Sequence, residues 1–148
     1  MNDNEKNTWE QISIKSGCYP YAIGRFDIDK FLLIGESIGR RCNRQSDDVG
    51  LTLTLIKELE EFFNYRVFKS TRQAKVPEGQ RKICLVRNVH TGDYHAYVQK
   101  SDGVWRHKMV GEKPEIATEK EIFGDENEPL NNSFIKRWIF LLKPKGAN

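Results

Sequence analysis

Apolar residues recur at intervals of three and four in the clearest helical segment of the chain. They are Leu51, Leu55, Leu59 and Phe62, with Ile56 and Phe63 beside them. This spacing places the apolar side chains on one face of an α-helix. Asp47 or Asp48 precedes the first of them and can cap the helix N-terminus. The pattern therefore predicts a helix that begins at residue 47 or 48 and ends near Asn64.

The second half of the chain changes to the short apolar runs that are typical of β-strands. Residues 82–87 contain a continuous apolar stretch, which predicts a central strand covered on both faces. Ser101-Asp102-Gly103 is a turn signal that predicts a hairpin. Further strands are predicted at residues 66–69, 93–100, 104–109 and 138–142. A helical first half followed by an antiparallel sheet is an α+β plan.

The remaining segments are expected to lack regular structure. Residues 1–8 are polar and predict a disordered tail, which leaves one domain over residues 9–148. Gly35, Gly39 and the polar run 40–48 predict an irregular loop. The charged stretch 111–132 contains an acidic run at 119–128, which we expect to be a solvated loop.

Composition narrows the class of protein. A chain of 148 residues with 38% hydrophobic and 11% aromatic residues suits one globular domain with an aromatic-rich core. The formal net charge is +3, which is smaller than nucleic-acid-binding domains usually carry, so no nucleic-acid partner is expected. The polar N-terminus predicts no Sec signal peptide, and no apolar run reaches the ~18 residues of a membrane span. We therefore expect no membrane insertion.

Three widely spaced cysteines, Cys18, Cys42 and Cys84, do not form a disulfide framework or a zinc motif. No metal or cofactor is therefore expected. Cys84 lies in the apolar run of the central strand and is expected to be a core thiol, whereas Cys42 lies among arginines and is expected to be an exposed loop thiol.

Cys18 has the one sequence context that could activate a thiol. It follows the turn signal Ser16-Gly17, and Pro20 is tolerated in a helix only within the first turn, so a helix that starts here has Cys18 at its N-terminus. The helix dipole would favour the thiolate and lower the pKa of the Cys18 thiol. The alternative is a small buried apolar residue, since free cysteine is among the most buried residue types.

The predicted hairpin carries His95 and His107 on its two strands. If the loop has three residues, Lys100 lies opposite Val104, His107 lies opposite Tyr97, and the two histidines are diagonal neighbours on one face. A two-residue loop would place them on opposite faces. In the first register, His95 can serve as a base for a cysteine nucleophile and His107 can orient it. The alternative is a pair of half-exposed strand histidines.

Two segments resemble bacterial papain-like cysteine peptidase domains. Gly-Cys18-Tyr-Pro-Tyr-Ala-Ile-Gly and Ile34-Gly-Glu-Ser-Ile-Gly39 are similar to the Asn-Cys-Tyr-Ala-Tyr-Ala-Leu and Pro-Gly-x-x-x-Gly segments of that group. The block Asp93-Tyr-His-Ala-Tyr-Val-Gln-Lys-Ser-Asp-Gly-Val-Trp-Arg-His-Lys108 closely resembles the group's Asp-Tyr-His-x-Tyr-x-Gln-x-Ser-Asp-Gly-x-Trp-x-His-Lys block. The chain departs from the pattern at Gly17, where Asn is usual, and at Ile34, where Pro is usual.

This resemblance implies a papain-like fold, with N-terminal helices packed on a C-terminal antiparallel sheet. It also implies the Cys-His-His arrangement of NlpC-type cell-wall peptidases, with Cys18 as nucleophile, His95 as base and His107 as the third polar residue. Gln11 lies a few residues upstream, where such enzymes often keep an oxyanion donor. Candidate residues for a substrate groove are Tyr19, Tyr97 and Trp105.

The function expected from this resemblance is a cysteine peptidase or amidase that cleaves an amide bond, with a peptide or peptidoglycan as substrate. Such a chain would act as a secreted antibacterial or effector-type toxin, made in the bacterial cytoplasm and exported by a specialised secretion system. An immunity or target protein would be its partner. A close variant is an effector that cleaves or deamidates a host protein. The alternative is a catalytically inert binding or immunity-type module on the same fold, which the departures at Gly17 and Ile34 favour.

Overall fold

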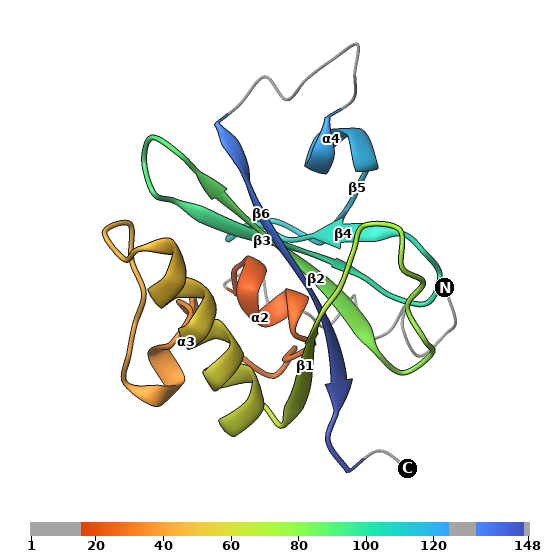
Figure 1. Ribbon diagram of the computed structural model, residues 1–148, viewed down its shortest axis with the longest axis horizontal. Helices are drawn as coiled ribbons and strands as arrows, with labels where there is room; N and C mark the ends of the chain where they lie inside the picture. Colours follow the sequence, from red (N-terminus) through yellow and green to blue (C-terminus); the bar gives the residue numbers. More distant parts are fainter. Residues whose placement is uncertain (1–15, 125–132, 147–148) are drawn as a thin grey trace.

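Six antiparallel strands form one sheet in the order β1-β6-β2-β3-β4-β5, with short helices around it (Figure 1). The computed structural model describes residues 16–124 and 133–146, so the expected tail at residues 1–8 lies outside the described part. The helical elements are α2 (Cys18–Ala22), the 3₁₀ turn η1 (Glu36–Ile38), α3 (Asp48–Glu61) and α4 (Glu119–Phe123). The strands are β1 (Tyr65–Lys69), β2 (Arg81–Asn88), β3 (Tyr94–Gln99), β4 (Trp105–His107), β5 (Glu115–Ala117) and β6 (Phe134–Pro144). The α+β expectation is confirmed.

The expected central strand is β2, which pairs with β6 on one side and β3 on the other. All six of its inner residues are buried, as the continuous apolar run predicted. The predicted closing strand is β6, which inserts between β1 and β2; Phe140 and Leu142 of its apolar run are buried, and the other three residues of the run are half-buried. No helix among the described residues is long and apolar enough to span a membrane.

The side chains of the sheet pack into two apolar clusters. Alternate residues of β2, Ile83 and Leu85, belong to a cluster that also contains the buried faces of α2 and α3. The intervening residues, Cys84 and Val86, belong to a second cluster with Trp105. Residues of β5 and α4 complete that second cluster. The sheet therefore has an apolar layer on each face, and each layer is roughly set by the two-residue period of the strand.

The predicted long helix is confirmed as α3. Asp47 caps it, because its carboxylate accepts a hydrogen bond from the backbone N–H of Gly50 at 2.6 Å. Leu51, Leu55 and Leu59 are buried on the face that packs toward the sheet. The helix ends shortly before Asn64, whose φ of 63° lies in the left-handed region and reverses the chain into β1.

The charged stretch after residue 111 contains structure that the sequence did not predict. It forms β5, which pairs with β4, and α4, so the expectation of a solvated loop is wrong for residues 119–123. Thr118 caps α4 by accepting a hydrogen bond from the N–H of Glu121 at 3.1 Å. Ile122 is 1% exposed and packs into the second cluster. Ala117 and Phe123 pack in the same cluster, and Arg137 Nε donates to the Ile122 carbonyl at 2.9 Å, so apolar contacts and hydrogen bonds dock this segment despite its charges.

The expectation of an exposed Cys42 is also wrong, because this side chain is buried in the first cluster. The backbone N–H of Cys42 donates to the carbonyl of Ile34 at 2.8 Å, and the carbonyl of Cys42 accepts from the hydroxyl of Tyr94 at 3.3 Å. These bonds fold the arginine-rich loop back onto the core. The flanking arginines remain at the surface while the cysteine turns inward.

A buried carboxylate on α3 ties this helix to the first third of the chain. Glu58 is fully buried, and its Oε1 accepts hydrogen bonds from the hydroxyl of Tyr19 at 2.5 Å and from the N–H of Gly35 at 3.0 Å. Its Oε2 accepts from the N–H of Ser37 at 2.9 Å. One side chain therefore fixes α2 and η1 against α3.

We expect Glu58→Ala to lower the free energy of unfolding by about 3 kcal/mol or more, because three donors inside the protein would lose their acceptor. Urea unfolding at pH 7 measures this change. Glu61→Ala, at an exposed position of the same helix, is the matched control and should change stability by about 0.5 kcal/mol or less. Equal effects of the two substitutions would contradict a structural role for Glu58.

Candidate active site

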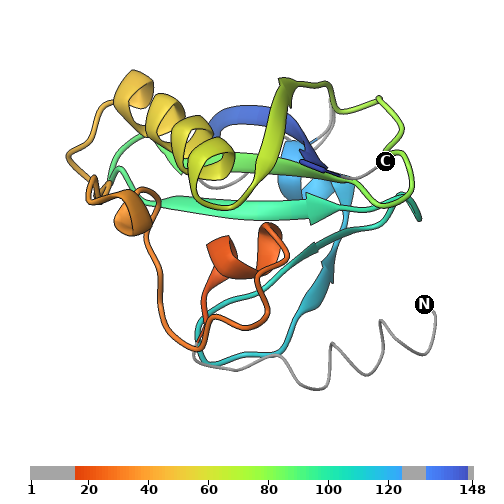
Figure 2. The same cartoon turned by 90° about the horizontal axis from the view of Figure 1, so that it is seen from below.

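Cys18 is the first residue of α2, as the turn signal and Pro20 predicted. Its neighbour Gly17 is the N-cap and has an extended backbone. Figure 2 shows α2 lying in the angle between β3 and β4. That angle opens because the two strands pair only through Val98 with Arg106 and Gln99 with Trp105. The edge of β3 beyond these pairs is therefore available to the start of α2.

The sulfur of Cys18 occupies this gap. The backbone N–H of Ala96 on β3 is directed at the Cys18 sulfur, together with the N–H groups of Cys18 and Tyr19. Ala96 is the residue that follows His95, so the nucleophile candidate lies against the strand that carries the candidate base. A fully paired β4 would instead place a backbone carbonyl opposite this N–H.

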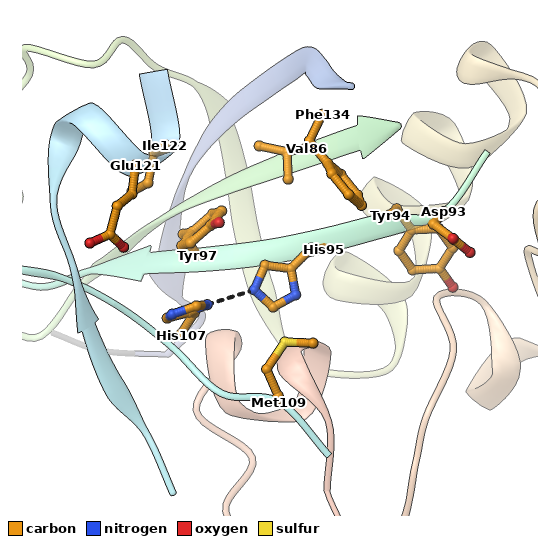
Figure 3. A pocket seen from close by; sticks show the side chains of 10 residues that line it. All are labelled: Val86, Asp93, Tyr94, His95, Tyr97, His107, Met109, Glu121, Ile122 and Phe134. Carbon is orange, nitrogen blue, oxygen red and sulfur yellow. Dashed lines mark hydrogen bonds between the residues drawn. The ribbon is translucent and has the colours of Figure 1, made fainter. Parts of the chain in front are cut away.

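The two hairpin histidines meet, in the register that a three-residue loop predicts. Val98 lies opposite Arg106 and Gln99 opposite Trp105, which continues to Tyr97 opposite His107. The Gly103 N–H donates to the Lys100 carbonyl at 3.0 Å and closes the loop. His95 Nε2 lies 2.8 Å from His107 Nδ1, as the dashed line in Figure 3 marks. The predicted proximity of the histidines is confirmed.

Tyr97 holds both imidazoles in place. Its ring stacks on the His107 ring with centroids 4.9 Å apart and meets the His95 ring edge-on at 4.8 Å. All three side chains line one cavity of about 430 Å³, which we call the histidine cavity. Its lining is Val86, Asp93, Tyr94, His95, Tyr97, His107, Met109, Glu121, Ile122 and Phe134. Burial raises the pKa of Tyr97 to about 12, so its hydroxyl stays protonated beside the pair.

Both histidines are neutral near pH 7. Burial, with a smaller effect of His107, lowers the pKa of His95 to about 4. Burial also lowers the pKa of His107, although the carboxylates of Glu115, Glu121 and Glu112 oppose this shift. Two neutral imidazoles can form this hydrogen bond when His95 carries its proton on Nε2 and donates it to the lone pair of His107 Nδ1. In that tautomer, His95 Nδ1, on the side of the ring away from His107 in Figure 3, keeps a lone pair that can accept a proton.

The resting thiol of Cys18 differs from the expectation of a lowered pKa. Burial raises the pKa of the Cys18 thiol, and it outweighs the lowering effects of the Ala96 N–H, the first N–H groups of α2 and the charge of Lys108. The physical reason is that α2 has only five residues, so its dipole is weak against the desolvation of a thiolate. The site at rest therefore contains a thiol and a neutral imidazole rather than an ion pair.

Lys108 is a site residue that the sequence did not indicate. It is 1% exposed, and its ammonium donates to the backbone carbonyls of Ser16 and, at 3.3 Å, of Met109. Burial lowers the pKa of Lys108, whereas the nearby Cys18 opposes that shift. Lysine side chains are usually solvent-exposed, so the residue type did not predict that Lys108 is buried. Its position in the histidine-containing block was the only available signal.

A second cavity, of about 480 Å³, adjoins the first and contains Cys18. We call it the cysteine cavity. Its lining is Cys18, Tyr19, Phe31, Leu32, Leu33, Asn43, Arg44, Gln45, Asp93 and Tyr94. Asp93 and Tyr94 line both cavities. Cys18 and the histidine pair thus lie on neighbouring hollows that meet at the start of β3.

The other substrate-binding candidates do not gather at this point. Trp105 is 2% exposed and packs against Phe123 in the second cluster, which corrects the expectation that it lines a substrate groove. Tyr19 reaches the wall of the cysteine cavity, but it is 2% exposed and its hydroxyl is bound to Glu58, so its role is structural. Gln11 lies outside the described residues. Within the described ranges, no group of three or more His, Cys, Asp or Glu side chains could hold a metal ion.

The buried neutral state of His95 should make folding sensitive to acid. Its pKa is about 4 in the folded chain against an ordinary 6.5, so the unfolded chain binds more protons between these pH values. Stability from this group is complete above pH 6.5 and is lost as the pH falls toward 4, by up to about 3 kcal/mol.

Urea unfolding at pH 7 and pH 4.5 measures this loss. Between these pH values, the free energy of unfolding should fall less for His95→Gln than for the unsubstituted chain. His90→Gln, in an exposed turn, controls for the loss of one imidazole. Parallel pH profiles for His95→Gln and the unsubstituted chain would contradict the buried neutral state.

Comparisons with known proteins give no assignment for this site. No family model, no curated protein and no solved structure matches the chain. The features that bear on function are therefore the arrangement of Cys18, His95 and His107 and the sequence resemblance.

Proposed function

We propose that this chain is a thiol-dependent peptidase or amidase, in which Cys18 attacks the carbonyl of an amide bond, His95 transfers the proton and His107 orients His95. The observation that carries the proposal is the pair His95–His107, hydrogen-bonded at 2.8 Å, with His95 on the strand whose Ala96 N–H lowers the pKa of the Cys18 thiol. The proposed fold is papain-like, with the nucleophile at a helix start and the base on the sheet.

In the first step, His95 Nδ1 removes the Cys18 proton as the sulfur forms a bond to the substrate carbonyl carbon. The carbonyl oxygen becomes an oxyanion, and the first N–H groups of α2 are the available backbone donors because they have no partner within the helix. His95 gains a positive charge in this step. The hydrogen bond from His95 Nε2 to His107 Nδ1 then holds the imidazolium in position.

In the second step, His95 returns the proton to the nitrogen of the scissile bond, the C–N bond breaks and an amine leaves. The acyl group remains on Cys18 as a thioester. His95 then removes a proton from water, the hydroxide attacks the thioester carbon, and the released thiolate regains the proton. His95 therefore acts as a neutral base when it takes a proton and as an imidazolium acid when it returns that proton.

A second candidate is a catalytically inert binding module on the same fold. The observation that favours it is the raised pKa of the Cys18 thiol, since a protonated thiol is a poor nucleophile. The two candidates differ in whether His95 increases the reactivity of Cys18. They share the same cavities and differ only in chemistry.

Labelling with iodoacetamide separates these candidates without a known substrate. In a hydrolase, Cys18 should react at least about tenfold faster than the buried Cys42 and Cys84, and His95→Gln should slow its labelling by a similar factor because the proton acceptor is lost. Intact mass and peptide mapping give the rates at each cysteine. A Cys18 rate that does not depend on His95 would support the inert module.

Hydrolysis should follow the same residues when peptidoglycan fragments and a panel of proteins are offered as substrates. Cys18→Ala should abolish amide cleavage, and His95→Gln should reduce kcat by about 100-fold or more. His107→Ala should cause a smaller loss than His95→Gln because it removes orientation alone. Cys84→Ala is the matched control, since this thiol is fully buried in the second cluster. The Cys84→Ala variant should keep the activity of the unsubstituted chain. Cleavage that survives Cys18→Ala would overturn the proposal.

A further inference from the structure

We infer that the cysteine cavity is the pocket for the acyl side of the substrate and that it takes a bulky aliphatic or aromatic side chain of a protein chain. This inference rests on the proposed function and adds the substrate class. It favours a protein substrate over a peptidoglycan stem peptide, whose side chains are mostly alanine methyl groups and carboxylates.

The positions of the two cavities indicate where each half of the substrate would bind. The leaving amine must receive its proton from His95, so the leaving half lies over the histidine cavity. The acyl half remains bonded to Cys18, which lines the cysteine cavity on the other side of Tyr94. The side chain next to the scissile carbonyl therefore has the cysteine cavity as its nearest hollow.

The wall of the cysteine cavity is suited to an apolar side chain. Phe31, Leu32, Leu33 and Tyr94 contribute to its lining, and the volume of about 480 Å³ lies within the range of about 300 to 1,000 Å³ found for ligand pockets. Phe31 is 56% exposed, so its ring has one face open to solvent. An apolar side chain that covers this ring would remove surface from water on both partners.

Further apolar side chains stand exposed around the nucleophile. A Cβ placed on Gly17 would lie 3.2 Å from Cδ2 of Phe31 and 3.2 Å from Cγ2 of Val110, so both side chains lie against the residue that precedes Cys18. Val110 is 51% exposed, and Met109, which lines the histidine cavity, is 48% exposed. The absence of a side chain at Gly17 lets the Phe31 ring reach this position. The departure from the Asn of the resembled group therefore has a structural use at the mouth of the site.

The charges at the cysteine cavity do not match a free carboxylate. Its two charged lining residues are Arg44 and Asp93, and Arg44 Nε donates to the Asp93 carboxylate at 2.5 Å. Recognition of a carboxylate usually needs a cation that is not already matched by an acidic side chain. The ion pair leaves the rim close to neutral, which favours an uncharged substrate side chain.

The test uses peptidyl acyloxymethyl ketones of the form acetyl-Gly-X, with X as Ala, Glu, Leu or Phe, because their acyl side resembles that of the substrate. Labelling of the full chain is followed by intact mass. We expect Leu and Phe probes to modify Cys18 at least about tenfold faster than Ala and Glu probes. Added apolar groups that fill a pocket typically raise the reaction rate by about tenfold or more. Phe31→Ala should reduce the Leu-to-Ala ratio at least about threefold.

Phe68→Ala is the matched control, because Phe68 is a similarly exposed phenylalanine on β1 and does not line either cavity. The Phe68→Ala variant should keep the Leu-to-Ala labelling ratio of the unsubstituted chain. Modification of Cys18 that depends on His95 but shows no Leu or Phe preference, or a preference that survives Phe31→Ala, would overturn the inference and leave the proposed function standing. Fastest modification by the Ala or Glu probe would overturn it in favour of a peptidoglycan stem.

Failure of the proposed function gives a different result. In that case no probe modifies Cys18 in a manner that depends on His95. The cavity is then tested by titrating acetyl-Gly-Leu-amide and acetyl-Gly-Ala-amide into Cys18→Ala and following backbone amide resonances. Tighter binding of the Leu peptide that is lost in the Cys18→Ala, Phe31→Ala double variant would keep the cavity as an apolar binding pocket, and equal binding would overturn it.

Discussion

The separation of β4 from β3 after two residue pairs is the constraint on which the site depends. If the ladder continued, β4 would occupy the edge of β3, and the N–H of Ala96 would have a strand as partner. The early separation instead leaves room for α2, and the Ala96 N–H acts on the Cys18 thiol, whose pKa it lowers. The two residue pairs that do form set the register in which His107 meets His95 from the facing strand. One short ladder thus joins the two histidines and leaves space for the start of α2 beside them.

Buried charges hold the segments that surround this gap. Glu58 binds α2 and η1 to α3, and Lys108 binds the carbonyls of Ser16, just before α2, and of Met109. Lys82, on β2, donates in the same way to the carbonyls of Thr71, Arg72 and Ala74. Each of these ions is compensated by several backbone groups, which offsets the cost of removing it from water. The loops of this small domain are therefore fixed by side chains of the core rather than by long regular elements.

The sequence predicted the elements whose periodicity is strong. The helix over Leu51, Leu55 and Leu59 and the buried strand around Cys84 formed as expected, because their apolar spacing leaves few alternatives. Ser101-Asp102-Gly103 predicted the hairpin but left two registers open, and the structure has the three-residue loop in which His95 and His107 meet. Regular pattern and turn chemistry decided these features before any long-range contact was considered.

The remaining features depend on contacts between distant segments, which a single sequence does not reveal. The burial of Cys42 depends on hydrogen bonds to Ile34 and Tyr94, and that of Lys108 on the carbonyl of Ser16. The docking of α4 depends on Ile122 and Phe123 within a charged stretch and on the hydrogen bond from Arg137 to the Ile122 carbonyl. Trp105 was misjudged because an aromatic residue beside a candidate site can face the core equally well. In each case a local pattern was overridden by tertiary packing.

The protonated resting state of Cys18 has a consequence for the lifetime of the site. Peroxide and disulfides react with thiolates far more readily than with thiols, so reactive cysteines are commonly lost to oxidation. Burial keeps the Cys18 thiol protonated, and His95 is neutral in the resting site because the proton stays on the sulfur. The same burial that disfavours the thiolate therefore slows oxidation of the resting Cys18 thiol.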